Sequence, residues 1–146
     1  MNRSKRNTKI IGKVAHRRSA LMARIKGKNT KPEMVVRREA HSLGFRFRLH
    51  QRKLPGSPDL AFPRLHKVIF VHGCFWHRHS GCNRTTTPKT RVNFWNEKFR
   101  ENMKRDASVM RRIEDAGWKS IIVWECETLD RDRLKKRLRR FLGGRA

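Results

Sequence analysis

The pattern of apolar and polar positions predicts a helix followed by three strands in the first half of the chain. Apolar residues recur at helical spacing after Thr30 and stop at Gly44, and residues 45–50 then alternate between apolar and basic side chains. Helical spacing followed by strict alternation is typical of a helix that leads into a half-buried strand. Residues 59–62 and 67–71 are short apolar runs between turn residues, and they predict two further strands.

The second half predicts a long helix, a buried strand and a final helix. The long helix begins near Asn93 and ends before Gly117, and its apolar positions are Trp95, Phe99, Met103, Ala107, Met110 and Ile113. Residues 120–124 are continuously apolar, so we expect a strand covered on both faces. Asp130 can cap a last helix with seven basic residues from Arg131 to Arg140. This order predicts an α/β fold with a mixed sheet sandwiched by helices.

The net charge of the chain indicates what kind of molecule it binds. Over 146 residues, 38 Lys and Arg stand against 12 Asp and Glu, a formal net charge of +26. Such a charge destabilises the compact state by self-repulsion unless a polyanion binds, so nucleic acid is the expected partner and an anionic membrane the weaker alternative. No window is apolar for long enough to cross a bilayer, and residues 1–6 lack the apolar segment of a signal peptide. We therefore expect a soluble intracellular protein.

Residues 1–28 differ in composition from the rest of the chain. They contain ten basic residues and no acid, which indicates a basic arm that orders on nucleic acid. A solvated tail is an equal alternative for residues 1–15, whereas the spacing of Leu21, Met22 and Ile25 suggests a short helix. We divide the chain into an arm over 1–28 and one folded domain over 29–146.

Metal-binding residue types gather directly after the predicted strand 67–71. Cys74, His79 and Cys82 have the spacing C-x4-H-x2-C, and Cys126 follows the strand 120–124. If these two strands are neighbours, the four side chains meet at adjacent strand ends, where a tetrahedral zinc site could close. Four protein ligands leave no open position, which predicts a structural zinc. The alternative is that Cys126 is an ordinary buried thiol and that the other two cysteines flank a loop.

A carboxylate and two further histidines indicate catalysis near the same strand ends. Asp59 opens one predicted strand, and His72 ends the next. A carboxylate and a backbone oxygen at such a position suit Mg²⁺, although Asp59 could instead satisfy a turn. His72 and His77 are not needed by the zinc site, and a histidine with a pKa near neutrality can take a proton from water that attacks a phosphate. The alternative for each is a core histidine with one hydrogen bond.

Consecutive aromatic residues inside a polar loop are a third unusual feature. Phe75 and Trp76 lie within the metal loop, where they are poorly placed to be core residues. In a protein this basic they could stack on bases or wedge between them, together with Trp95. Trp95 alone is more often part of a helix core.

These residues together resemble the very short patch repair endonucleases. The matching segments are Leu54–Asp59, Val68–His77 with its His-Gly-Cys-Phe-Trp-His core, Asn93–Lys98, Asn102 with Arg105 and Asp106, and Gly117–Trp118 leading to Val123–Cys126. The likeness runs from about Arg18 to Leu142. It implies a restriction-endonuclease-like fold, and an enzyme that recognises a T·G mismatch left by deamination of 5-methylcytosine and nicks 5′ to the mispaired thymine.

The resemblance also implies roles for individual residues. It makes Asp59 a Mg²⁺ ligand, with the backbone carbonyl of Val71 as a second, and His77 the general base. The other roles that it implies are active-site support by His72, Glu33 and Asp106, structural zinc ligation by Cys74, His79, Cys82 and Cys126, and intercalation beside the mismatch by Phe75, Trp76, Trp95 and Met22. Glu33 also fits a capping box with Thr30.

The chain departs from the family pattern at three places, and alternatives to the mismatch activity follow. Val71 stands where the family has a hydroxyl residue, one residue is inserted between His79 and Cys82, and the basic arm is unusually rich in Lys and Arg. A related restriction-type nuclease on matched DNA is one alternative, and a non-catalytic zinc-containing DNA-binding protein is another. The resemblance further implies a monomer of the prokaryotic cytoplasm and nucleoid that works with a mismatch-repair matchmaker and a DNA polymerase.

Overall fold

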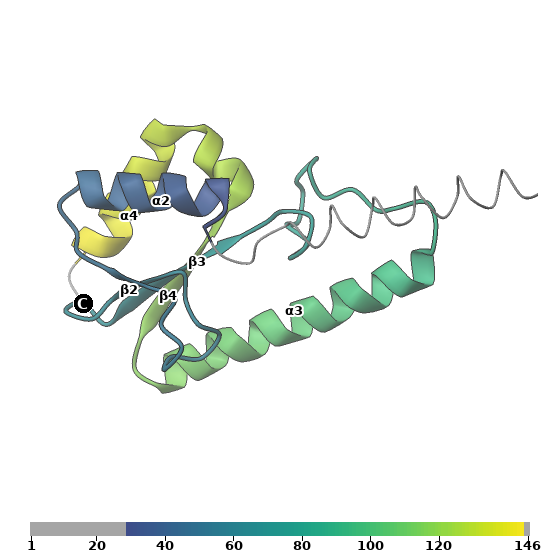
Figure 1. The fold of residues 1–146 in the computed structure, drawn as a ribbon, viewed down its shortest axis with the longest axis horizontal. Helices are drawn as coiled ribbons and strands as arrows, with labels where there is room; N and C mark the ends of the chain where they lie inside the picture. Colours follow the sequence, from purple (N-terminus) through teal and green to yellow (C-terminus); the bar gives the residue numbers. More distant parts are fainter. Residues whose placement is uncertain (1–28, 145–146) are drawn as a thin grey trace, which may run out of the picture. The chain divides into compact units, whose positions relative to one another are not determined.

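The computed structural model describes residues 29–144. The predicted arm over 1–28 and the intercalating role of Met22 lie outside these residues. Along the described chain the elements are α2 (Lys31–Ser42), β1 (Arg48–Leu49), β2 (Leu60–Phe62), β3 (Lys67–His72), α3 (Val92–Asp115), β4 (Lys119–Trp124), the 3-10 helix η1 (Glu125–Leu129) and α4 (Arg131–Gly143). The predicted order of helices and strands is confirmed, with η1 as an addition (Figure 1). No helix of this part is long and apolar enough for a membrane span.

The sheet has four strands in the order β1-β2-β3-β4. β1 and β2 are antiparallel, as are β2 and β3, whereas β3 and β4 run parallel, with Ile69 opposite Ile121 and His72 opposite Trp124. The expected mixed sheet is therefore present. Because β3 and β4 are parallel neighbours, their carboxyl ends open at the same edge of the sheet.

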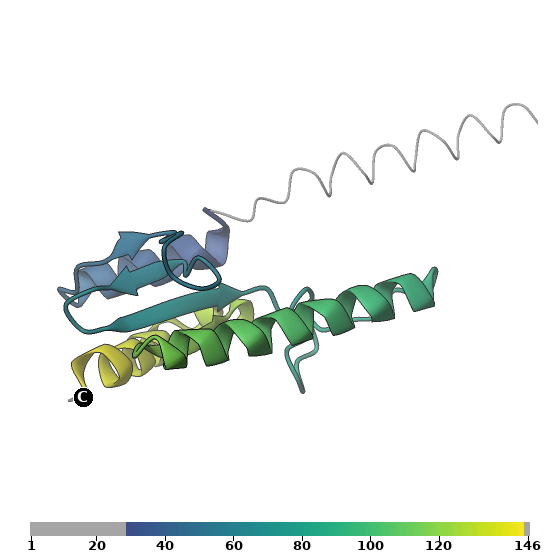
Figure 2. The same cartoon turned by 90° about the horizontal axis from the view of Figure 1, so that it is seen from below.

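Helices cover both faces of the sheet, each against its own apolar cluster. α2 and α4 lie on one face and α3 on the other (Figures 1 and 2). Alternation along β3 sends Ile69 to the cluster under α2 and α4, and it sends Val68 and Phe70 to the cluster under α3. The α4 side chains in the first cluster are Leu134, Leu138 and Leu142, which are buried at helical spacing. The two-sided packing explains why the centre of β3, residues 68–71, is apolar without interruption.

The degree of burial along β4 and α3 depends on where the sheet ends. β4 packs against both clusters, with Ile121 and Val123 on the α2 and α4 side and Ile122 on the α3 side, as its apolar sequence predicts. Because it is an edge strand, only Val123 among its six residues is fully buried. The amino-terminal half of α3 extends past the sheet (Figure 2). Met103 is therefore 54% exposed and Ala107 is exposed, and only Phe99, Val109 and Ile113 of this helix are buried.

The turn before β2 packs closely against α3. Gly56 has a φ of 71°, and a Cβ atom at this position would lie 2.4 Å from Cγ1 of Val109 and 3.2 Å from the Phe70 ring. Glycine is therefore needed for both its conformation and its size. This contact fixes the loop that leads to Asp59 against the helix that carries Asp106.

Lys67, the first residue of β3, caps the carboxyl terminus of α4. Its side chain is almost fully buried, and its ammonium group donates to the carbonyl oxygens of Phe141 at 2.6 Å and Gly144 at 3.0 Å. A cation is favourable at a helix carboxyl terminus, where carbonyl groups lack partners within the helix. Lys67 thereby joins the end of α4 to the sheet.

Candidate active site and metal centre

The loop after β3 and the turn after β4 bring four potential metal ligands together. One ligand atom from each of Cys74, His79, Cys82 and Cys126 lies within 4.8 Å of every other. Nδ1 of His79 is 3.7 Å from Sγ of Cys74 and 3.4 Å from Sγ of Cys126. With metal–sulfur and metal–nitrogen bonds of about 2.3 and 2.0 Å, an S···N edge of a tetrahedron is about 3.5 Å. The group therefore has the spacing of a tetrahedral metal site.

The surrounding residues hold this Cys3His group in place. The hydroxyl of Thr85 donates to the carbonyl oxygens of both His79, at 2.7 Å, and Cys74, at 3.2 Å. The imidazole of His79 stacks on the indole of Trp124, the last residue of β4, with ring centroids 4.3 Å apart. Gly81 has a φ of 72°, and no atom lies within 4 Å of the position where its Cβ would be. The turn between His79 and Cys82 is thus open at this glycine.

A second group combines two carboxylates and a histidine. Glu33 in the first turn of α2, His50 after β1 and Asp59 before β2 place their ligand atoms within 4.8 Å of one another. Oε1 of Glu33 is 2.9 Å from Nε2 of His50, and its other oxygen accepts from Arg37. The carboxylate of Glu33 therefore faces this group, as its expected active-site position requires.

Asp59 is held in a setting that disfavours its ionised form in the absence of a cation. Burial raises its pKa to about 7 from an ordinary value of 3.8, and the neighbouring carboxyl of Glu33 adds to the rise. The backbone N–H of Val71 opposes it by donating to Oδ2 at 2.7 Å. Burial would also raise the pKa of Glu33, but hydrogen bonding and the charges of Arg37 and His50 lower it. Two carboxylates so placed favour a bound cation.

The third group comprises His72, His77 and Asp106, with ligand atoms again within 4.8 Å of one another. Nδ1 of His77 lies 2.7 Å from Oδ2 of Asp106 on α3. A carboxylate at Nδ1 stabilises the tautomer with its proton on that nitrogen, which leaves Nε2 with a lone pair. The tautomer follows from this contact, and it is the form that a general base requires.

His72 has an unsatisfied polar atom at this point. Its ring stacks on that of His77 with centroids 3.8 Å apart, and burial lowers its pKa to about 4, with the nearby His77 adding to the effect. Its buried Nδ1 has no hydrogen-bond partner among residues 29–144. An unpaired buried nitrogen costs about 1–3 kcal/mol, so it is an observation that favours a ligand here.

Aromatic side chains form a separate cluster between the metal loop and α3. Phe75 contacts Trp76, Trp95 and Phe99 with ring centroids 5.1, 5.8 and 5.2 Å apart, and Trp76 lies 5.8 Å from Trp95. Phe75, Trp76 and Trp95 are only half-buried, whereas Phe99 is buried beneath them. The three predicted intercalating residues are therefore brought together, partly open to solvent.

Arg78 braces this cluster from the same loop. Its guanidinium lies 3.9 Å from the Phe99 ring centroid and 5.8 Å from that of Phe75. It donates to the carbonyl oxygen of Thr86 at 2.8 Å and to the hydroxyl of Thr87 at 2.9 Å. Arg78 thus connects the aromatic rings to the segment that precedes α3.

Comparison with known proteins assigns the family. Residues 13–84 match the profile described as DNA mismatch endonuclease Vsr. The chain is 46% identical over 126 residues to the type II nicking enzyme V.XorIIP of Xanthomonas oryzae pv. oryzae, a match that covers 86% of this chain and 92% of that protein. The chain belongs to the Vsr family. As a member of the Vsr family, it is a DNA endonuclease.

Two further relatives agree with this assignment. The type II nicking enzyme V.NmeAIP of Neisseria meningitidis is 40% identical over 126 residues, which cover 86% of this chain and 89% of the relative. The DNA mismatch endonuclease Vsr of Escherichia coli K12 is 43% identical over 91 residues, which cover 62% of this chain and 58% of the relative. The resemblance drawn from the sequence motifs is thereby confirmed.

Within this Vsr-family site, sequence reasoning missed His50 and Arg78. His50 ends the alternating run 45–50, and its φ of 45° turns the chain there, so its only signal was a histidine at a strand end. Arg78 lies between two histidines, where it reads as another basic residue of a basic protein. The backbone carbonyl of Val71, expected as a Mg²⁺ ligand, stays a prediction, and the contact observed is that of its N–H with Asp59.

Proposed function

We propose that this Vsr-family endonuclease uses Mg²⁺ to nick DNA 5′ to the thymine of a T·G mismatch that arises from deamination of 5-methylcytosine. The observation that carries the catalytic part is the hydrogen bond between His77 and Asp106, on the residue that the sequence analysis assigns as general base. The substrate is supported by the family description and by the E. coli relative, which are named for mismatch endonuclease activity.

The side chains around Asp59 suit Mg²⁺. Mg²⁺ prefers oxygen ligands and keeps several waters, so one or two carboxylates suffice to hold it. Asp59 would be the main ligand, because its carboxylate is buried beside that of Glu33, where a bound cation would stabilise the ionised form. A carboxylate oxygen of Glu33 lies within 4.8 Å of one of Asp59, so Glu33 could bind the same ion. The backbone carbonyl of Val71 is the further oxygen ligand that we expect. When bound, the ion supplies Lewis-acid stabilisation of the charge that develops on the phosphate.

His77 would act as the general base at its Nε2 atom. Asp106 holds the proton on Nδ1 and orients the ring, so Nε2 is left to take a proton from the attacking water. Asp106 then stabilises the imidazolium that forms. His72, whose Nδ1 has no partner in the described chain, would orient the water or a phosphate oxygen beside His77.

The Cys3His group would hold a structural zinc. Thiolate and imidazole ligands at tetrahedral spacing favour Zn²⁺, and all four positions are filled by protein side chains. The bound ion would fix the loop that carries His77, two residues before His79. The aromatic cluster on the same loop would then present Phe75, Trp76 and Trp95 to the base pairs beside the mismatch, with Met22 of the arm on the other side.

The experiment is strand nicking of two end-labelled duplexes that differ only in a T·G mismatch within a methylase-type site. A single nick 5′ to the mispaired thymine, in Mg²⁺ and absent from the paired duplex, is the expected result. Asp59→Asn is the matched control, because it keeps the size of the side chain and an acceptor for the Val71 N–H while it removes the charge. Its binding to DNA should persist while its nicking is lost.

Other outcomes would replace the proposal. Equal cutting of both duplexes would identify a restriction-type nuclease on matched DNA. Full activity of Asp59→Asn would remove Asp59 from catalysis. A protein that binds DNA and zinc but cuts neither duplex, over a range of flanking sequences, would be the non-catalytic DNA-binding module. The matchmaker and polymerase partners and the monomeric state would be tested by sedimentation and pull-down with purified components.

A further inference from the structure

The polar side of α4 forms a basic groove that begins at the Cys3His group. A cavity of about 470 Å³ is lined by Cys126, Glu127, Asp130, Arg133, Leu134, Lys136, Arg137 and Arg140. A second cavity of about 390 Å³ is lined by Lys67, Lys119, Ile121, Arg137, Arg140, Phe141 and Gly144. Arg137 and Arg140 line both, so the groove continues from the turn after β4 along α4 to its carboxyl end.

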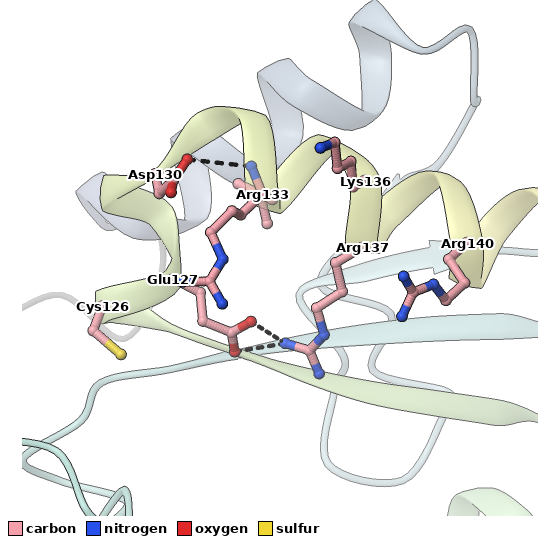
Figure 3. Close-up of a pocket in the computed structure, with 8 residues that line it drawn as sticks. Cys126, Glu127, Asp130, Arg133, Lys136, Arg137 and Arg140 are labelled. Carbon is pink, nitrogen blue, oxygen red and sulfur yellow. Dashed lines mark hydrogen bonds and ion pairs between the residues drawn. The ribbon is translucent and has the colours of Figure 1, made fainter.

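Three arginines of α4 share one side of the helix. Arg133, Arg137 and Arg140 are spaced by four and three residues, and their side chains extend to the same side of the helix (Figure 3). Leu134, Leu138 and Leu142 are buried on another side of α4. The arginines are therefore not used to pack the helix on the sheet, and they line a surface of their own.

Glu127 holds the side chain of Arg137 in the groove, and the groove keeps a net positive charge. Both oxygens of Glu127 accept from Nη1 of Arg137, and Oε1 also accepts from the backbone N–H of Trp124. Asp130 accepts from the backbone N–H of Arg133 as the N-cap of α4. In the first cavity four basic side chains face these two carboxylates, and the second cavity has no acidic lining residue. The groove keeps a net positive charge.

The spacing fits the backbone of a nucleic acid. From Arg133 to Arg140 the helix rises about 10 Å. One strand of B-DNA carries a phosphate every 3.4 Å of axis, so this length spans about three steps between successive phosphates. The apolar lining residues of the groove are Leu134, which is 1% exposed, and the half-buried Ile121 and Phe141. Basic side chains outnumber them in both cavities, which favours a polyanion over an apolar segment of a peptide.

We infer that the α4 groove binds the phosphate backbone of the duplex flanking the nick, on the side of the Cys3His group. Cys126 is both a member of that group and a lining residue of the groove, so a duplex in the active site can continue onto α4. The contacts are made to phosphates, so they add affinity for any sequence. The inference rests on the family's action on DNA and not on the mismatch specificity proposed above.

The test compares two double variants of the full-length protein. Arg133→Gln with Arg140→Gln removes two charges from the groove, and Arg131→Gln with Arg139→Gln removes two from the same helix at positions that line neither cavity. Binding of a labelled, fully paired duplex is measured by anisotropy across a salt titration. We expect the slope of log K against log [salt] to become shallower by about two contacts, or roughly 1.8, in the groove variant. The other variant should match the wild type.

Truncated duplexes locate the contact. For this step the duplex carries a T·G mismatch that fixes the register of the protein. Shortening it on one side of the mismatch should abolish the difference between the groove variant and the wild type, and shortening it on the other side should leave the difference intact. Equal slopes for the two double variants would overturn the inference, because the effect would then be one of net charge. An unchanged slope together with lost binding of a polyglutamate peptide would overturn it in favour of an acidic protein. These binding results are independent of whether a T·G mismatch is nicked.

Discussion

The guanidinium of Arg78 lies 3.9 Å from the centroid of the Phe99 ring. Phe99 is the buried base of the aromatic cluster, and Arg78 also holds the loop at Thr86 and Thr87. A contact between a cation and an aromatic face is worth about 0.5–2 kcal/mol, depending on its exposure to water. Arg78 is therefore a positioning residue for the aromatic side chains that we expect to enter the duplex.

Arg78→Met should loosen the aromatic cluster without removing a catalytic group. We expect mismatch binding to weaken by about 5- to 30-fold, from the loss of roughly 1–2 kcal/mol. The maximal nicking rate at saturating DNA should stay near that of the wild type, and tryptophan emission should shift to longer wavelength. Arg78→Lys keeps the charge but not the planar contact, so it should be intermediate. A variant with unchanged affinity and emission would contradict this role.

Asp106→Asn should impair the proposed base by favouring the wrong tautomer of His77. An amide can donate to Nδ1, which would move the proton to Nε2 and leave no lone pair for water. We expect the single-turnover nicking rate to fall by about 10²–10⁴-fold, with DNA affinity and metal content retained. Nicking at the wild-type rate would show that His77 does not depend on Asp106.

Asp59→Asn should stabilise the protein in Mg²⁺-free buffer while it abolishes activity. The folded state holds the Asp59 proton up to pH about 7, whereas the unfolded chain releases it near 3.8, so the wild type loses stability as pH rises through this window. At pH 8 the variant avoids that loss, and we expect its free energy of unfolding to be higher by on the order of 1–2 kcal/mol.

Urea unfolding at pH 4.5 and pH 8 measures the Asp59 effect. The difference between the variant and the wild type should be small at the lower pH. Added Mg²⁺ should stabilise the wild type at pH 8 and leave Asp59→Asn unchanged. A variant that is less stable than the wild type at pH 8 without Mg²⁺ would refute the raised pKa.

Cys126→Ser should release the metal and destabilise the whole domain. Cys126 is the only ligand of the Cys3His group outside the loop after β3, so its loss detaches that loop from the end of β4. We expect one zinc per wild-type chain by elemental analysis and none in the variant. The loss of stability should be on the order of 3–5 kcal/mol. A variant that lacks metal but is as stable as the wild type would show that the Cys3His group does not hold a structural metal ion.

Gly56→Ala should cost more than Gly44→Ala. Both glycines have positive φ, at 71° and 87°, so both variants lose about 1 kcal/mol to backbone strain. Only at Gly56 would the new methyl meet Val109, which adds roughly 1–3 kcal/mol. Equal losses in urea unfolding would mean that the turn can move away from α3.

The local parts of this structure could be predicted, and the parts that depend on distant contacts could not. Asp130 as the cap of α4 and the spacing of Cys74, His79 and Cys82 follow from short patterns. The parallel pairing of β3 with β4, which brings Cys126 to these residues, could only be stated as a condition, because it joins segments about 50 residues apart. The exposure of Met103 could not be read from helical spacing, because it depends on where the sheet ends. His50 was missed for a similar reason, since its meaning comes from Glu33 across the fold.

The open turn at Gly81 has a consequence for how related enzymes can diverge. No atom lies within 4 Å of the position where a Cβ of Gly81 would be, and the residues on either side, His79 and Cys82, belong to the same Cys3His group. Residues can therefore be gained or lost at this turn while His77 keeps its contact with Asp106. The loop can vary in length at its outer end without any change in the chemistry at its inner end, which makes this turn a natural place to graft a reporter or a tether.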